Sequence, residues 1–80
     1  MPVRFDSDLA RFEAACTAEE ALPLAEWLET AAAPQVDLSA CTELHTALLQ
    51  LVLAARPALA AAPEDAFLAR WIGPLLARAG

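Results

Sequence analysis

The chain has 80 residues and a mass of 8.5 kDa, which suits one small domain over residues 1–80 and excludes a second domain or a large buried active-site cavity. With 59% hydrophobic residues and a mean hydropathy of +0.44, it is too apolar to be intrinsically disordered. The formal net charge is −6, and the five arginines are spread along the chain, so neither nucleic acid nor an anionic membrane is an expected partner.

No stretch of the sequence looks like a targeting or membrane-spanning segment. Asp6 and Asp8 interrupt the first ten residues, and Gln50, Arg56 and Pro57 break the most apolar run. We therefore expect a cytoplasmic protein without direct membrane insertion. The whole excess of negative charge lies in residues 1–40, which we interpret as a solvated face.

The first fifteen residues have the pattern of a β-hairpin. Apolar positions alternate with polar ones in segments 3–5 and 9–15, and the cluster Asp6-Ser7-Asp8 between them is typical of a turn. A helix is the alternative for the second segment, because its three alanines favour helix.

A capping box is predicted where Thr17 precedes Glu20 by three residues, because each side chain then bonds the other residue's amide. The helix that follows should end near Ala32. Its regular part is expected to begin at Leu22 or Pro23, since proline is tolerated only in the first turn. The apolar stripe of this helix consists of Leu24, Trp27, Leu28 and Ala31.

The middle of the chain predicts a strand followed by a long helix. Residues 35–39 are too few for a helix and are read as a strand, with residues 40–42 as a loop. Nothing breaks a helix over residues 43–56 before Pro57. Its sheet-facing residues should be Leu44, Leu48, Leu51, Val52 and Ala55.

The last third of the chain predicts a short strand and a final helix. Residues 57–63 lie between two prolines and suit a short strand, although alanine is a poor strand former. Residues 63–65 open a helix that Gly73 and Pro74 should kink or divide. The expected buried stripe of this helix is Leu68, Trp71, Ile72, Leu75 and Leu76.

The order of these elements predicts the fold class. Strands that alternate with helices give an α/β domain in which a small mixed sheet of about four strands packs against about three helices. Trp27 and Trp71 recur with leucines at helical spacing, so both are expected in the core rather than in a ligand site.

The central helix is more apolar than one buried face requires. If its sheet-facing residues are as above, His45, Thr46, Leu49, Gln50 and Leu53 lie towards the other side. Leucines beside polar residues on that side are either covered by another element of this chain or form a contact surface for a partner.

Thr46 falls in the first turn of that helix. A phosphate there would meet the positive end of the helix dipole, so Thr46 is a candidate phosphorylation site. The alternative is an ordinary solvent-facing threonine.

Residues 36–55, with the sequence VDLSACTELHTALLQLVLAA, resemble the signature region of STAS domains, the anti-sigma-factor antagonist family. In that family a strand ending in DLS leads through a short loop to D-[S/T]-[S/A]-G-L at the start of a helix. The most similar subgroup has D-[S/T]-A-G-L-x-L-L. The resemblance extends over most of residues 9–76 as an order of elements, and it implies a STAS-like fold.

The positions that match are Asp37, Leu38, Ser39, Thr46, Ala47 and Leu49. His45 stands where the family has aspartate, and Leu48 stands where it has glycine. The serine that sporulation-type antagonists use as phosphoacceptor falls on Ala47, which leaves Thr46 as the hydroxyl of the motif.

The resemblance implies a non-enzymatic regulatory module that binds a kinase-like anti-sigma factor or a chemotaxis protein. The implied contacts are Ser39, His45, Thr46, Leu49 and Gln50. Relatives of this kind also include the accessory subunit of a lipid-asymmetry ABC transporter, so a transporter ATPase is the second expected partner. A small homodimerisation domain that uses Leu49, Leu53 and the last helix is the third hypothesis.

Catalytic and metal-binding chemistry has little basis in the sequence. The single histidine, His45, lies four residues after Cys41, a separation that pairs side chains only within a helix. Cys16, Cys41 and His45 are a weak basis for a zinc site, and no glycine-rich phosphate loop exists. We expect no cofactor and no metal. The two cysteines are expected to be reduced and buried. A STAS-like fold would imply that they end neighbouring parallel strands, where they could lie close together.

Overall fold

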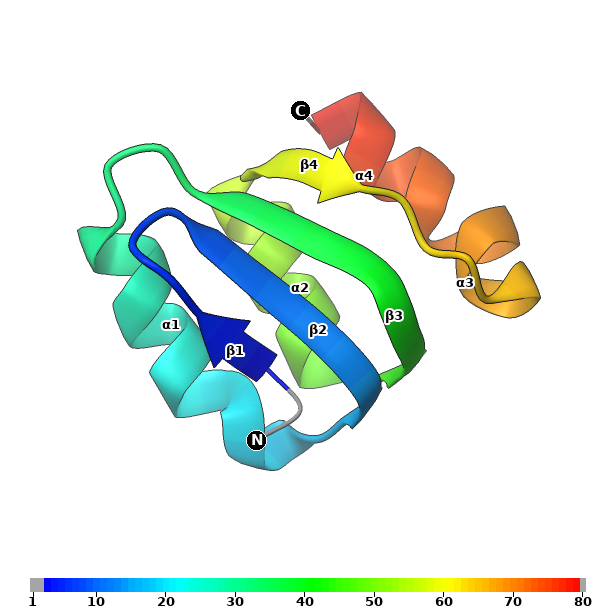
Figure 1. Ribbon diagram of the computed structural model, residues 1–80, viewed down its shortest axis with the longest axis horizontal. Coiled ribbons are helices and arrows are strands. Elements are labelled where there is room, and N and C mark those ends of the chain that lie inside the picture. Colours follow the sequence, from blue (N-terminus) through cyan, green and yellow to red (C-terminus); the bar gives the residue numbers. More distant parts are fainter. Residues whose placement is uncertain (1–2, 80) are drawn as a thin grey trace.

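A four-stranded mixed β-sheet with helices on one side forms the framework of the protein in the computed structural model (Figure 1). The structure describes the backbone of residues 3–79 and the side chains of residues 3–76. The expected α/β fold with a small mixed sheet is confirmed. In chain order the elements are β1 (Val3–Phe5), β2 (Leu9–Cys16), the 3-10 turn η1 (Ala18–Glu20), α1 (Ala21–Thr30), β3 (Gln35–Leu44), α2 (Thr46–Ala55), β4 (Ala58–Ala61), α3 (Ala66–Trp71) and α4 (Gly73–Ala79).

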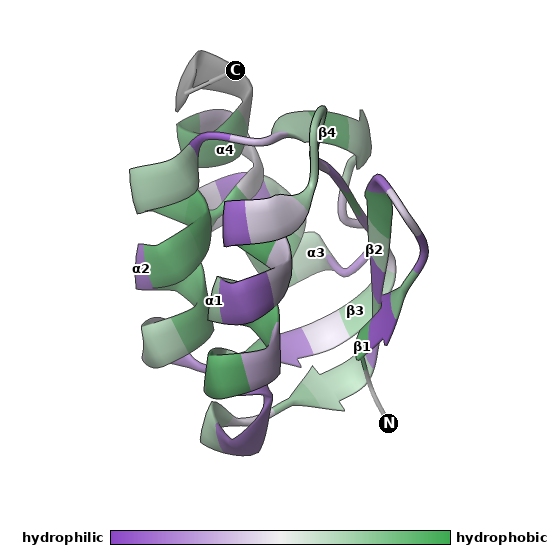
Figure 2. Cartoon of the chain, turned by 90° about the vertical axis from the view of Figure 1, so that its left-hand side faces the viewer, coloured by the Kyte–Doolittle hydropathy of each residue, from purple (hydrophilic) through white to green (hydrophobic). Residues whose placement is uncertain are grey.

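The strands lie in the order β1-β2-β3-β4, so each strand pairs with the next one along the chain. β1 and β2 form an antiparallel hairpin, whereas β2, β3 and β4 run parallel. The parallel pairs are joined through α1 and α2, because a parallel connection needs a crossover of a dozen or more residues. Figure 2 shows α1, α2 and α4 on the same side of the sheet. No helix formed by residues 3–79 combines the length and the apolar character needed to span a bilayer.

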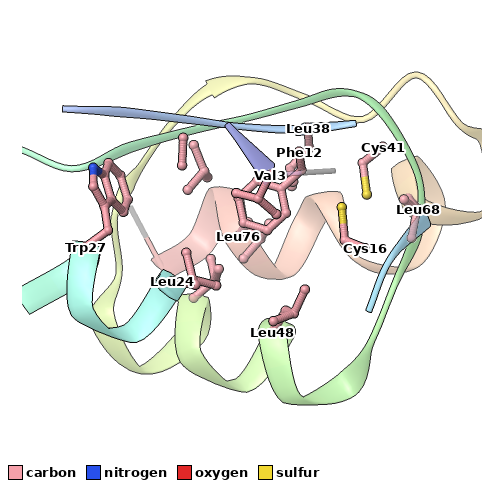
Figure 3. Close-up of a cluster of buried hydrophobic side chains, with 13 residues drawn as sticks. Val3, Phe12, Cys16, Leu24, Trp27, Leu38, Cys41, Leu48, Leu68 and Leu76 are labelled. Carbon is pink, nitrogen blue, oxygen red and sulfur yellow. The ribbon is translucent and has the colours of Figure 1, made fainter. Parts of the chain in front are cut away.

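The core lies between the sheet and the helices (Figure 3). The strands contribute mainly alternate residues, because successive side chains of a strand point to opposite faces. Trp27 links α1 to the hairpin, since its Nε1 donates to the Asp6 carbonyl at 2.9 Å and its ring packs against Phe5 with centroids 5.7 Å apart. The buried apolar residues are Val3, Ala10, Phe12, Cys16, Leu24, Trp27, Val36, Leu38, Cys41, Leu48, Val52, Leu68 and Leu76.

The hairpin prediction is confirmed, and the helical alternative for residues 9–15 is wrong. The turn closes where the Asp6 amide donates to the Leu9 carbonyl at 2.7 Å. β2 is irregular at Ala14, whose φ of 55° lies in the left-handed region and coincides with a shift in the register against β3. Such irregularities insert a residue and bend the strand.

The prediction of a capping box at Thr17 and Glu20 is wrong. The Thr17 side chain makes no capping bond; instead its carbonyl accepts from the Glu20 amide at 3.1 Å, which closes the 3-10 turn. The Glu20 side chain is buried, and its Oε1 has no hydrogen-bond partner among the described residues. α1 begins at Ala21, one residue earlier than expected, with Pro23 in its first turn, and ends at Thr30 rather than near residue 32.

Strand β3 is twice as long as the sequence predicts. It runs over Gln35–Leu44, so residues 40–42, expected to be a loop, belong to the strand. Ala40 and Cys41 pair with β2, opposite Glu13 and Ala14, and Thr42 lies at a shift in the register. Pairing with a strand that is distant in sequence supplies backbone hydrogen bonds that local propensity does not reveal. The following helix therefore begins at Thr46 and not at residue 43.

The last third of the chain follows the prediction in outline. β4 forms beside β3, with Leu59 opposite Val36, and the final helix divides at Gly73. The buried stripe is wrong at Trp71 and Leu75, whose relative exposures are 56% and 45%. α3 and α4 are oriented so that Leu68 and Leu76 face the core and Trp71 and Leu75 face away from it, and the buried face is narrower than the predicted stripe. Trp27 is in the core as expected, and Trp71 is not.

Candidate functional site at the start of helix α2

The junction between β3 and α2 is built by His45, which caps the helix. β3 ends at Leu44, and His45 has an extended backbone with φ −63° and ψ 143°. Its Nδ1 accepts a hydrogen bond from the Ala47 amide at 3.0 Å. An imidazole nitrogen can accept only when it carries no proton, so this geometry requires the tautomer with the proton on Nε2. The sequence missed this role because the helix was expected to start two residues before His45.

Thr46 is the first residue of α2, and its side chain is exposed. The next three amides of the helix already have acceptors. Ala47 donates to the His45 ring, and Leu48 and Leu49 donate to the His45 carbonyl at 3.0 and 3.1 Å. A phosphate on Thr46 would therefore be favoured by the helix dipole and by solvent exposure rather than by those amides.

A hollow of about 190 Å³ lies beside His45, where β2 and β3 end. The His45 amide donates to the Cys16 carbonyl at 3.0 Å, so the cap of α2 is fixed to the end of β2. The lining residues are Ala15, Cys16, Thr17, Glu43, Leu44 and His45. They include an acid and a hydroxyl but no lysine or arginine, so the hollow is not suited to an anionic ligand.

Four of the five predicted contact residues lie together at the start of α2. His45, Thr46 and Gln50 are exposed at the start of α2, and Leu49 is half-buried between them and the core. Ser39 is separate. It lies in the middle of β3 and lines a different hollow, of about 170 Å³, together with Arg11, Phe12, Glu13, Asp37 and Ala40.

The faces of α2 only partly match the prediction. Leu48 and Val52 are buried, whereas Leu51 is half-buried and Ala55 is exposed. Leu44, the remaining residue of the predicted face, is half-buried and belongs to β3 instead of α2. The prediction divided α2 into a buried and an open face. In the structure α1 and α4 both pack against α2, so residues at the sides of the helix, such as Leu51, are only partly covered.

Leu49 and Leu53 lie on the flank of α2 opposite Leu51, and both are half-buried against the core. Helix α4 packs against α2, so an element of the same chain lies beside this helix. The side of α2 that remains open starts at Thr46 and continues through Gln50.

The two cysteines are free and buried, and they come from neighbouring parallel strands. Figure 3 shows their sulfur atoms pointing towards each other. The hydrogen bond between them raises the pKa of Cys16, which burial raises further, and lowers the pKa of Cys41. The Cys41 thiol also donates to the Glu43 carbonyl at 3.3 Å. These bonds satisfy the thiols inside the core.

The residues considered for metal binding and for nucleophilic chemistry lie apart in their roles within the described part of the chain. No three side chains of histidine, cysteine, aspartate or glutamate within it are placed to hold a metal ion. His45 uses its Nδ1 for the cap and Cys41 bonds a backbone carbonyl, so the two are not engaged with each other as a nucleophile and base would be.

Asp37 is held as a carboxylate by Ser39. Its Oδ1 accepts from the Ser39 amide at 2.9 Å and from the Ser39 hydroxyl at 2.7 Å. The amide bond, followed by the hydroxyl bond, lowers the pKa of Asp37, and the nearby charge of Arg11 lowers it further. Ser39 is therefore occupied by a bond within the sheet.

Asp37→Asn is expected to make stability depend less on pH. A lowered pKa in the folded state stabilises the fold above the unfolded value of about 3.9, and this contribution is lost as the pH falls through the lower folded value. Because the carboxylate is largely solvated, we expect a loss below about 1 kcal/mol at pH 7 that shrinks towards pH 2. Urea unfolding of the variant and the original chain at pH 7 and at pH 2 measures this loss of unfolding free energy. Equal losses at both pH values would contradict the assignment, and Ser39→Ala should produce part of the effect.

Comparisons with protein-family models, with curated proteins and with solved structures gave no match to this chain. The resemblance to STAS domains therefore stays a prediction from residues 36–55 and from the order of the elements.

Proposed function

We propose that this chain is a non-enzymatic regulatory module that binds a protein partner through the start of α2, as its resemblance to STAS domains implies. The observation that carries the proposal is the position of Thr46, which is exposed at the first position of the helix that follows β3, a strand paired in parallel on both sides. A buried Thr46, or a helical bundle without a sheet, would have been incompatible with this role.

The chemistry of the surface supports a protein as the partner. Thr46 and Gln50 offer polar groups one turn apart on α2, with the half-buried Leu49 beside them. No cation lies in this group of residues, so phosphates of nucleic acids or lipids have no counter-charge here. A kinase-like anti-sigma factor or a chemotaxis protein is the partner that the resemblance favours.

Phosphorylation of Thr46 would regulate this contact. A phosphate adds a charge of about −1.5 to −2. The dipole of α2 tolerates that charge in the free protein, but a docked partner would have to desolvate it. We therefore propose that phosphorylation releases the partner without unfolding the module.

The variant Thr46→Glu tests this proposal. We expect partner affinity to fall by about fivefold or more, equivalent to about 1 kcal/mol, because a charge enters the interface. The circular dichroism spectrum should not change, since an acid in the first turn suits the helix dipole. The partner is first captured from an extract with the immobilised chain, and its affinity is then measured by calorimetry.

Thr30→Glu provides the matched control, because Thr30 is exposed at the end of α1, the opposite end of the helix layer. This variant should bind like the original chain. Unaltered affinity of Thr46→Glu would remove Thr46 from the interface. Capture of an ABC-type ATPase instead of a kinase-like protein would replace the proposed partner by the transport alternative.

A further inference from the structure

Three of the four large apolar side chains that are most exposed in the described structure form one stripe. Phe67 and Trp71 on α3 and Leu75 on α4 have relative exposures of 65%, 56% and 45% and follow each other at intervals of four residues. We call these three residues the α3–α4 stripe. Single exposed apolar residues are common on protein surfaces, but three large ones at a regular four-residue spacing suit a contact surface.

A second apolar feature is a groove between α1 and α2 of about 280 Å³. It is lined by Ala25, Leu28, Glu29, Leu51, Ala54 and Ala55, and we call it the α1–α2 groove. Two leucines and three alanines make the lining mostly apolar, and Glu29 contributes the one carboxylate among the lining residues. Leu28 and Leu51 are only half-buried there, so the chain itself does not fill the space.

The charges of the two features are complementary. The Arg70 guanidinium lies over the Trp71 ring at 5.1 Å from its centroid, so the stripe presents aromatic rings together with a cation. The groove presents aliphatic walls together with the carboxylate of Glu29. If the Trp71 side chain entered the groove, Arg70 would come close to the Glu29 carboxylate. A charge pair that is partly removed from water in this way fixes the orientation of the two surfaces.

The stripe does not fill the groove of its own molecule. Figure 1 shows α1 and α3 at opposite ends of the longest axis, along which the molecule extends 31 Å. The complementary surface therefore has to come from another molecule, and every other copy of the chain offers it.

We propose that the α3–α4 stripe of one copy docks into the α1–α2 groove of a second copy, with Arg70 beside the second copy's Glu29. This contact does not involve the start of α2, so it is independent of the proposed function. Because the two surfaces differ, the contact is head-to-tail. Such contacts add further copies unless a ring closes.

Sedimentation equilibrium of the full chain is the first test. The mass of the original chain should rise above 8.5 kDa with concentration. The double variant Phe67→Ser, Trp71→Ser removes the stripe, and Ala54→Lys places a long cation in the groove; both should remain at 8.5 kDa. All three positions are exposed, so the fold should tolerate these changes. Leu22→Ser is the matched control, because Leu22 is 70% exposed and lies outside both surfaces, and it should associate like the original chain.

Mixing the two monomeric variants separates this contact from other modes of association. The stripe variant keeps its groove and Ala54→Lys keeps its stripe, so an equimolar mixture should form a one-to-one complex of twice the 8.5 kDa mass. A mixture that stays monomeric would overturn the proposal, and association of Ala54→Lys by itself would show instead that stripes pair with stripes. An original chain that remains monomeric at about 1 mM, a concentration that populates even contacts of millimolar affinity, would also overturn the proposal.

Charge reversal gives a test that does not depend on removing apolar groups. Arg70→Glu and Glu29→Arg affect exposed side chains, and each alone should weaken association about tenfold. The mixture should recover both contacts. Arg70 of the Glu29→Arg chain meets Glu29 of the Arg70→Glu chain, and the two substituted side chains meet with their charges exchanged. Association of the single variants that equals that of the original chain would overturn the assigned pairing.

Discussion

Leu48→Ala is expected to lower the free energy of unfolding by about 2–5 kcal/mol, because Leu48 is completely buried under the sheet and its truncation leaves a cavity. A domain of 80 residues has a total stability of only about 4–12 kcal/mol. The variant should therefore be severely destabilised or unfolded at 37 °C. Chemical unfolding followed by circular dichroism measures the loss.

Leu51→Ala is the matched comparison, since it makes the same change one turn further along α2. Leu51 is half-buried at the α1–α2 groove, so part of its surface is already in water and the expected loss is about 1–2 kcal/mol. Helical periodicity alone places both leucines in the core and predicts the larger loss for each. A loss at Leu51 that equals or exceeds the loss at Leu48 would mean that α2 is rotated from the described orientation.

His45→Ala is expected to destabilise the protein by about 0.5–2 kcal/mol, the usual effect of removing a helix cap. The change deletes the acceptor of the Ala47 amide at the start of α2. His45→Asn should keep most of the stability, because the asparagine side-chain oxygen can accept from the same region of the backbone. Thermal unfolding of the three proteins at pH 8 gives the comparison.

An equal stability of the alanine and asparagine variants would show that the Nδ1 bond contributes little. The result also bears on the candidate site, since His45 both caps α2 and anchors the end of β2 through Cys16. If the alanine variant lost partner affinity as well as stability, the asparagine variant would separate the two effects. It keeps the cap but removes the imidazole from the surface.

The departure from the STAS pattern at position 45 has a physical interpretation. The pattern has aspartate at this point, which is among the preferred capping residues. Histidine is not, yet Nδ1 of the imidazole performs the capping here. The local structure that presents Thr46 is therefore possible without the acid, and the chain differs from the pattern only in having no negative charge beside the threonine at this position.

The amino-acid sequence alone predicted most of the element order. Alternation around the acidic turn indicated the hairpin, the apolar spacing indicated α2, and the Gly73-Pro74 pair indicated where the last helix divides. These features depend on residues that are close together in the chain. The position of Thr46 near the start of a helix was predicted for the same reason.

Tertiary structure decided what local patterns leave open. Residues 40–42 became strand because β2 pairs with them, and this moved the start of α2 so that His45 became its cap. The exposure of Trp71 depends on how α3 is oriented after the chain leaves β4, which its spacing from Leu68 does not determine. Local propensity and periodicity are set by neighbours in sequence. Pairing, burial and the separation of Ser39 from Thr46 depend on strands and helices that meet only after the chain has folded.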